Sequence, residues 1–138
     1  MKTITSIFKE KHLKLTPQRI AVYKALQSTK SHPSAESIYK SLQEEYPTMS
    51  LATVYKALKT LVEVDLIQEL NVGEGNFRYD ANVYPHSHIK CCTCNKVEDI
   101  DCKIFEALNT EAEKQTKYKV LSNQIYFYGV CEDCYIAE

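Results

Sequence analysis

The first 65 residues repeat apolar positions at the spacing of an α-helix, in four stretches. The helices are expected at Ile4 to His12, from Thr16-Pro17, from Ser34 to Pro47, and after Ser50. The hydroxyl groups of Thr16, Ser34 and Ser50 can accept hydrogen bonds from the free amides at a helix N-terminus. Pro17 suits the first helical position, and Pro47 is expected to end the third helix.

After Asp65 the pattern changes to that of β-strands. Residues 66–72 and 77–80 flank the turn Gly73-Glu74-Gly75-Asn76, whose composition tolerates positive φ angles. Helices followed by such a hairpin predict a winged helix-turn-helix. This module places its last helix in the DNA major groove and its hairpin beside the backbone.

The remaining residues predict a second, smaller domain. Its elements are expected as strands at 88–93 and 96–100, a helix from Lys103 to about Lys117, and a long strand from Tyr118 to Val130. The predicted fold class is α+β, with a DNA-binding domain at 1–80, a hinge at 81–85 and the second domain at 86–138. A unit of about 50 residues usually needs a metal or a partner subunit for stability.

Composition and charge narrow the class of protein. Hydrophobic residues are 44% and charged residues 25% of the 138, which is typical of a water-soluble protein. No stretch has the length of a membrane span and the N-terminal residues lack a signal-peptide core, so we expect a cytoplasmic protein. Residues 1–60 carry a net charge of +6 and residues 61–138 a net charge of -7. The basic half suits nucleic acid and the acidic half suits cations, although such segregation also occurs without function.

Two Cys-x-x-Cys pairs indicate a metal site. Cys91 and Cys94 form one pair, and Cys131 and Cys134 form the other. Four thiolates complete the tetrahedral shell of structural zinc, and the two pairs bracket the second domain. A redox dithiol or a disulfide is the alternative, but the thioredoxin-like context is missing. Cys92 and Cys102 fall outside this scheme and are expected to be small buried thiols rather than sensors.

Histidines and aspartates suggest a second metal site. His86 and His88 stand two residues apart on a predicted strand, so their rings face the same side. His32, Asp80 and Asp99 are the further candidate ligands. A mixed nitrogen and oxygen shell suits Fe(II), Mn(II) or Zn(II). The alternative is that these are exposed polar residues in loops.

Several motifs occur together in one order. They are Thr16-Pro17-Gln18-Arg19, His32-Pro33-Ser34-Ala35, Ser50-Leu51-Ala52-Thr53-Val54-Tyr55, His86-x-His88-x-x-Cys91-x-x-Cys94 and Tyr128-Gly129-Val130-Cys131-x-x-Cys134. In these motifs the chain resembles the ferric uptake regulator family over nearly its whole length.

The resemblance implies a homodimer whose second domain provides the dimer contacts and a four-cysteine zinc site. It also implies a regulatory ion, Fe(II) or Mn(II) with Zn(II) possible in vitro, at the junction of the two domains. Its ligands would be His32, Asp80, His86, His88 and Asp99. Two aspartates in this set resemble the peroxide-sensing repressors of the family, in which bound Fe(II) reacts with peroxide and a ligand histidine, here His32 or His86, is oxidised. Residues 120–128 contain no histidine, which favours one regulatory site per subunit.

Family likeness and helix geometry together give the candidate DNA contacts. They are Lys14, Arg19, Ser50, Thr53, Tyr55, Lys56, Lys59 and Arg78. Tyr55 can contact a thymine methyl and Lys56 a guanine or a phosphate. The alternative for each is an ordinary side chain in water.

Three functions are compatible with these residues. The first is a metal-dependent repressor of transcription that binds double-stranded operator DNA and senses peroxide. The second is an iron or zinc uptake regulator that uses the metal only as co-repressor. The third is a metal-dependent enzyme, which we do not expect because no nucleophile or general base accompanies the histidine and aspartate residues.

Overall fold

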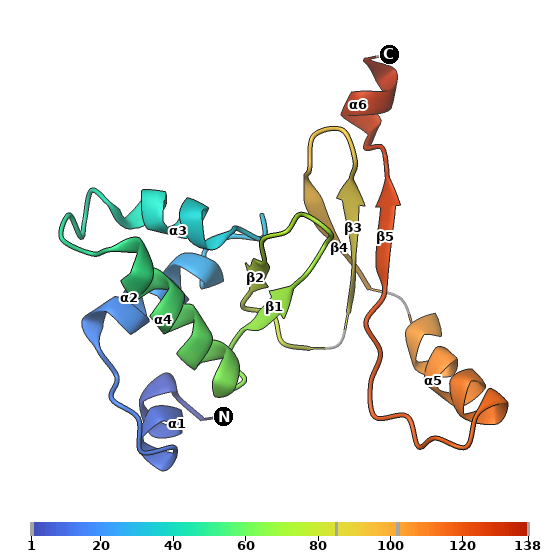
Figure 1. The fold of residues 1–138 in the computed structure, drawn as a ribbon, viewed down its shortest axis with the longest axis horizontal. Helices are drawn as coiled ribbons and strands as arrows, with labels where there is room; N and C mark the ends of the chain where they lie inside the picture. Colours follow the sequence, from blue (N-terminus) through green and yellow to red (C-terminus); the bar gives the residue numbers. More distant parts are fainter. Residues whose placement is uncertain (1, 85, 102, 138) are drawn as a thin grey trace. The chain divides into compact units, whose positions relative to one another are not determined.

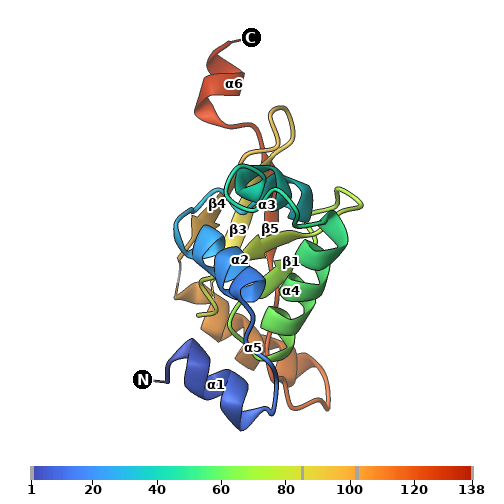
Figure 2. The ribbon, with the colours of Figure 1, turned by 90° about the vertical axis from the view of Figure 1, so that its left-hand side faces the viewer.

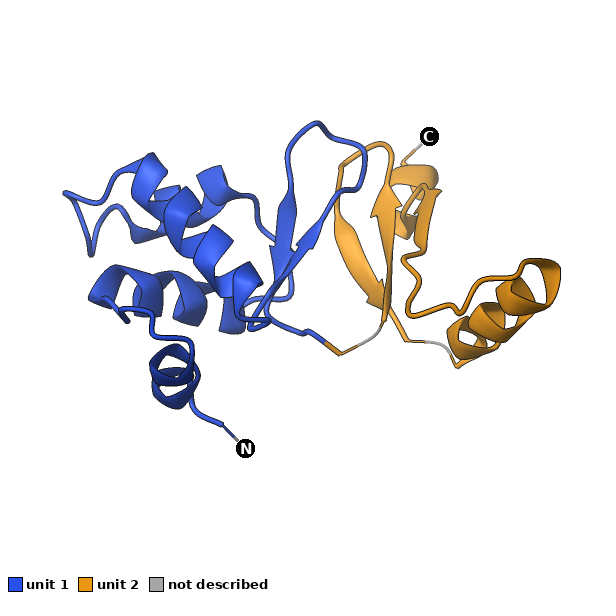
Figure 3. Cartoon of the chain, turned by 60° about the horizontal axis from the view of Figure 1, so that its bottom comes forward, with its two compact units in different colours: residues 1–83 blue, residues 84–138 orange. Residues whose placement is uncertain are grey.

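The chain divides into two compact units, residues 1–83 and residues 84–138 (Figure 3). The computed structural model describes residues 2–84, 86–101 and 103–137. The boundary between Val83 and Tyr84 falls inside the segment 81–85 that the sequence predicted as a hinge. Within the described residues, no helix has the length and apolar character needed to cross a membrane.

The first unit begins with four helices (Figures 1 and 2). They are α1 (Ile4–Glu10), α2 (Pro17–Gln27), α3 (Ala35–Leu42) and α4 (Leu51–Glu63). The predicted N-caps are confirmed, because the hydroxyls of Thr16, Ser34 and Ser50 each accept a hydrogen bond from the backbone amide three residues later. Helix α3 ends at Leu42, five residues before the predicted stop at Pro47.

The hydrophobic core of this unit is centred on α4. Its buried face carries Val54, Leu58 and Leu61, which belong to one cluster with Val22 of α2 and Ile38 of α3. The spacing of the three α4 residues is the i, i+4, i+7 pattern that brings side chains to one side of a helix. The opposite side of α4 is therefore left exposed, and it carries Tyr55, Lys56 and Lys59.

A two-stranded hairpin completes the first unit. Strands β1 (Gln68–Leu70) and β2 (Arg78–Asp80) pair antiparallel, with Glu69 opposite Tyr79. Both are shorter than the predicted 66–72 and 77–80. The turn between them carries Gly73 and Gly75 at φ angles of 84° and 78°, which glycine adopts without strain. Helices α2, α3 and α4 followed by this hairpin form the predicted winged helix.

The second unit contains a three-stranded sheet in the order β4-β3-β5 (Figure 1). Strand β3 (Ser87–Cys91) pairs antiparallel with β4 (Val97–Ile100) and parallel with β5 (Tyr126–Gly129). Helix α5 (Ile104–Gln115) lies near one end of the sheet and the short helix α6 (Glu132–Ile136) near the other. No residue of α5 is buried within this single chain.

The predictions for the second unit need three corrections. The long strand expected at 118–130 is confined to Tyr126–Gly129, because its partner β3 has only five residues and pairs with four of them. Helix α6 was not predicted. Cys92 is exposed rather than buried, because it lies in the turn after β3, whereas Cys102 lies outside the described residues.

Candidate metal centres

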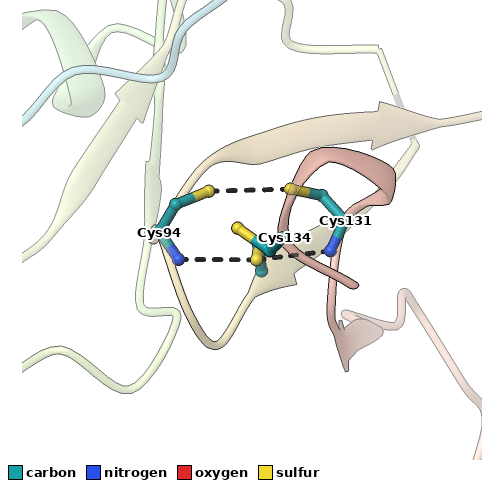
Figure 4. A group of neighbouring side chains, drawn as sticks. Cys94, Cys131 and Cys134 are labelled. Carbon is teal, nitrogen blue, oxygen red and sulfur yellow. Dashed lines mark hydrogen bonds between the residues drawn. The ribbon is translucent and has the colours of Figure 1, made fainter. Parts of the chain in front are cut away.

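The four cysteines of the two pairs come together in the second unit. The sulfur atoms of Cys91, Cys94, Cys131 and Cys134 all lie within 4.8 Å of one another. Cys91 ends β3, Cys94 lies in the turn that follows, and the other two lie at the start of α6 and within it. Figure 4 shows the sulfur atoms of Cys94 and Cys131 turned towards each other, 3.8 Å apart. The described cysteines are free thiols.

Backbone amides favour negative charge in this cluster. The amides of Cys131 and Cys94 donate to the sulfur of Cys91 at 3.3 and 3.5 Å, and these bonds lower the pKa of Cys91 to about 5. The hydrogen bond with Cys131 and burial raise the pKa of Cys134 to about 12. Four thiolates within 4.8 Å of one another repel unless a cation lies between them, and a tetrahedral sulfur shell suits zinc.

The first unit holds one histidine and aspartate pair. Nε2 of His32 lies 3.2 Å from Oδ2 of Asp80, and the two side chains are 2% and 11% exposed. Strand β2 positions this pair, because Asp80 ends β2 and its neighbour Tyr79 donates its amide to the carbonyl of Pro33 at 3.0 Å. His32 has a φ angle of 55°, in the left-handed region that residues other than glycine rarely adopt. Such a conformation is often found at functional sites.

The second unit brings two histidines together with one of its aspartates. Nε2 of His86 and Nε2 of His88 lie 3.2 and 3.4 Å from the same Oδ1 atom of Asp99. His88 and Asp99 are direct partners in the pairing of β3 with β4, and the ring centroids of the two histidines are 4.5 Å apart. Nδ1 of His86 lies 2.6 Å from the carbonyl oxygen of Tyr84. A proton on Nδ1 satisfies that carbonyl and leaves the Nε2 lone pair directed at Asp99.

Both groups bring electron-pair donors together around a small region. A neutral imidazole nitrogen and a carboxylate oxygen at this distance repel each other unless a proton or a metal ion lies between them. Nitrogen and oxygen donors in this proportion fit Fe(II), Mn(II) or Zn(II). Each group by itself is an incomplete metal shell.

Some of the candidate DNA contacts are exposed, and others are half-buried or hydrogen-bonded within the protein. Lys14, Ser50, Tyr55, Lys56 and Lys59 are exposed, and Arg19, Thr53 and Arg78 are half-buried. The Ser50 and Thr53 hydroxyls form a 2.9 Å hydrogen bond at the start of α4. Arg19 donates to the carbonyl of Lys14.

Arg78 is bound to protein groups on two sides. Its guanidinium donates to both carboxylate oxygens of Glu74, at 2.7 and 3.0 Å, and to the carbonyl oxygen of His32 at 3.1 Å. A phosphate contact by Arg78 would compete with these hydrogen bonds.

Sequence reasoning missed Glu36 as a neighbour of the candidate DNA contacts. The hydroxyl of Tyr55 donates to Oε1 of Glu36 at 2.6 Å. These residues are nineteen positions apart, and their meeting depends on how α3 packs against α4. The sequence signal was limited to an acidic residue in the first turn of a helix.

Comparison with known proteins agrees with the fold. The sequence matches the ferric uptake regulator family over residues 10–128. It is 70% identical over 134 residues to the transcriptional regulator PerR of Clostridium acetobutylicum, with 97% of each chain covered.

Two solved structures are similar over nearly their whole length. The ferric uptake regulator Fur of Helicobacter pylori, described as having three functional metal-binding sites, gives a TM-score of 0.83 at 26% identity, with 97% of this chain and 95% of that chain covered. The peroxide stress regulator of Campylobacter jejuni gives a TM-score of 0.76 at 34% identity, with 96% and 100% covered. The chain belongs to the ferric uptake regulator family of transcriptional regulators, as its motifs indicated.

Proposed function

We propose that this protein is a metal-dependent, DNA-binding transcription repressor that senses peroxide. A single regulatory ion is bound by His32 and Asp80 of the first unit together with His86, His88 and Asp99 of the second. The observation that carries the proposal is the convergence of donor atoms in each unit, at 3.2 to 3.4 Å. Asp80 and His86 are six residues apart, a span of at most roughly 20 Å, so one ion can join both groups.

The four cysteines hold a structural zinc ion, and the regulatory site takes Fe(II) or Mn(II). Bound Fe(II) supplies the redox chemistry with which hydrogen peroxide oxidises a ligand histidine, His32 or His86. In the net reaction one oxygen atom of the peroxide is added to the imidazole and the other leaves as water. The protein consumes its own side chain, so it is a sensor rather than an enzyme with turnover.

The regulatory ion controls DNA binding by fixing the angle between the two units. Helix α4 enters the major groove of operator DNA with its exposed face, which carries Tyr55, Lys56 and Lys59. In a homodimer this angle sets the spacing between the two α4 helices. Oxidation of a ligand frees the angle, so the spacing no longer matches the DNA.

Exposed apolar side chains of the second unit support the homodimer. They include Leu121, Tyr118, Ile136 and Ile104, which are 86%, 79%, 65% and 60% exposed in the single chain. Burial of this surface against a second copy stabilises association. The repressor acts in the cytoplasm, where thiols stay reduced.

The decisive experiment compares Fe(II)-loaded and Mn(II)-loaded protein after treatment with a small excess of hydrogen peroxide. We expect the Fe(II) form to gain one oxygen atom on a peptide containing His32 or His86 and to release DNA, whereas the Mn(II) form stays intact. The exposed His12 is the internal control and stays unmodified. DNA release by metal removal alone, with every histidine intact, would contradict peroxide sensing and favour an iron or zinc uptake regulator.

Elemental analysis tests the ion assignment. Protein prepared without chelator is expected to contain one zinc ion per chain that resists chelation and a second ion that exchanges. Retention of two equally labile ions would contradict a closed structural zinc site.

A further inference from the structure

One hydrogen bond links the exposed face of α4 to the start of α3. The Tyr55 hydroxyl donates to Oε1 of Glu36 at 2.6 Å, and both residues belong to the first unit. Tyr55 is 41% exposed, so its ring faces solvent while its hydroxyl is held by another helix. The ring is therefore fixed at both ends, by the α4 backbone and by the Glu36 carboxylate.

The bond joins a charged acceptor to a neutral donor. Glu36 lies in the first turn of α3, where the helix dipole favours negative charge. The hydrogen bond from Tyr55 lowers the pKa of Glu36, and the same bond raises the pKa of Tyr55. At neutral pH the carboxylate is ionised and the hydroxyl keeps its proton. Hydrogen bonds of this kind are shorter and stronger than those between neutral groups.

A carboxylate at this position opposes DNA binding in general. It is bonded to Tyr55, on the exposed face of α4 that also carries Lys56 and Lys59, and its negative charge repels the phosphates of a duplex bound there. The Glu36 carboxylate also limits which contacts Tyr55 can make with the bases. It occupies the Tyr55 hydroxyl, which then cannot donate to a base acceptor, and it presents one edge of the ring for apolar contact such as a thymine methyl.

We propose that Glu36 determines DNA sequence specificity by positioning Tyr55. It lowers the affinity for every duplex and fixes the ring in the orientation that a matching duplex fits. This inference rests on the proposed function, because it requires α4 to read DNA. Glu36 acts through Tyr55 and is a positioning residue.

The test uses full-length, manganese-loaded protein and two DNA probes. One is a duplex selected from a random pool by the wild-type protein, and the other is a scrambled duplex of the same base composition. Dissociation constants for both are measured at one fixed salt concentration. The ratio of the two affinities reports specificity, and the affinity for the scrambled duplex reports the general electrostatic effect.

Three variants separate charge from positioning. Glu36→Ala removes both, and we expect a roughly threefold gain in affinity for the scrambled duplex and a fall of about tenfold in the ratio. Glu36→Gln keeps an oxygen acceptor without the charge, so the affinity for the scrambled duplex rises while the ratio stays within about threefold of wild type. Tyr55→Phe keeps the ring but not the hydrogen bond, so the ratio falls.

The double variant Glu36→Ala with Tyr55→Phe gives the clearest readout. Because both changes break the same Tyr55–Glu36 hydrogen bond, the ratio of the two affinities in the double variant is expected to fall no further than in Glu36→Ala. Glu44→Ala, which removes an exposed acidic residue elsewhere in the first unit, is the matched control and keeps the wild-type ratio. Circular dichroism verifies that each variant is folded.

Two results would overturn the inference. One is a Glu36→Ala ratio within about twofold of wild type, and the other is a double variant in which the two losses multiply. Failure of the proposed function is distinguishable, because the manganese-loaded wild-type protein would then select no duplex from the pool.

Discussion

Nη1 of Arg78 lies 3.1 Å from the carbonyl oxygen of His32, so a side chain of the wing holds the backbone of a candidate metal ligand. His32 has a φ angle of 55°, and a left-handed conformation costs a residue with a side chain about 1–2 kcal/mol. A hydrogen bond from a charged donor stabilises by a similar amount. Arg78 therefore offsets the strain that places the His32 ring beside Asp80.

Replacement of Arg78 by alanine is expected to weaken the regulatory ion site. Without the hydrogen bond, His32 relaxes away from Asp80, and Mn(II) affinity falls about tenfold while the zinc content is unchanged. Isothermal titration with Mn(II) measures this. Arg19→Ala is the matched control, because Arg19 also donates to a backbone carbonyl but belongs to another part of the first unit. Equal Mn(II) affinities for Arg78→Ala and wild type would contradict the positioning role.

The cysteine cluster predicts different outcomes for two neighbouring thiols. Cys94→Ser removes a candidate ligand within 4.8 Å of the other three sulfur atoms, so zinc is lost and the second unit unfolds at lower temperature. Cys92→Ser changes an exposed thiol in the same turn and is expected to keep both zinc and stability. Elemental analysis and thermal denaturation measure these effects. Zinc loss in Cys92→Ser, or zinc retention in Cys94→Ser, would require another ligand set.

Tyr79 predicts a loss of stability in alkaline solution. Burial, together with the nearby Glu69 carboxylate, raises the pKa of Tyr79 to about 12 from its ordinary value near 10. The unfolded chain thus releases this proton first. The stabilising contribution is complete below about pH 10 and is lost as the pH rises towards about 12.

The measurement for Tyr79 is the free energy of unfolding in urea at several pH values above about pH 9. As the pH rises, the free energy of unfolding is expected to fall more in wild type than in Tyr79→Phe. Tyr84→Phe, at a tyrosine that is 75% exposed, serves as control and follows the wild-type curve. A Tyr79→Phe curve parallel to wild type would show that this hydroxyl does not ionise on unfolding.

The α4 core predicts a large stability effect at one position. Leu58 is fully buried in the main cluster of the first unit, so Leu58→Ala is expected to lower the free energy of unfolding by about 2–5 kcal/mol. Leu13→Ala changes a leucine that is 37% exposed and is expected to have a much smaller effect. Urea denaturation followed by circular dichroism measures both. Similar losses in the two variants would contradict the packing described for α4.

Local signals made the first unit predictable. The hydroxyls of Thr16, Ser34 and Ser50 mark helix starts through contacts only three residues long, and the apolar stripe of α4 follows from helix geometry. Strand length was less predictable, because β5 extends only as far as its pairing with β3. Polar residues at 122–124 interrupt the alternating pattern before β5 and mark where the strand cannot begin earlier.

The candidate site was predictable in its residue types and less so in its supporting contacts. The two cysteine pairs have a spacing that serves one ion, and His86 and His88 are brought to one side by strand geometry. The bonds of Arg78 to His32 and of Tyr55 to Glu36 join residues 46 and 19 positions apart. Such contacts depend on tertiary packing, which no short motif encodes. The joining of both units by one ion stays a prediction.

The turn between β3 and β4 has a consequence for the histidine and aspartate group of the second unit. It is closed by backbone hydrogen bonds from Cys91 to Lys96 and from Asn95 to Cys91, both at 2.9 Å, and it contains Cys94 of the sulfur cluster, while Cys91 ends the strand before it. His88 and Asp99 face each other across these strands. A slip of one residue would carry Asp99 to the opposite side of the sheet. Loss of the proposed zinc ion is therefore expected to loosen this turn, and with it the strand pairing that places Asp99 beside His88.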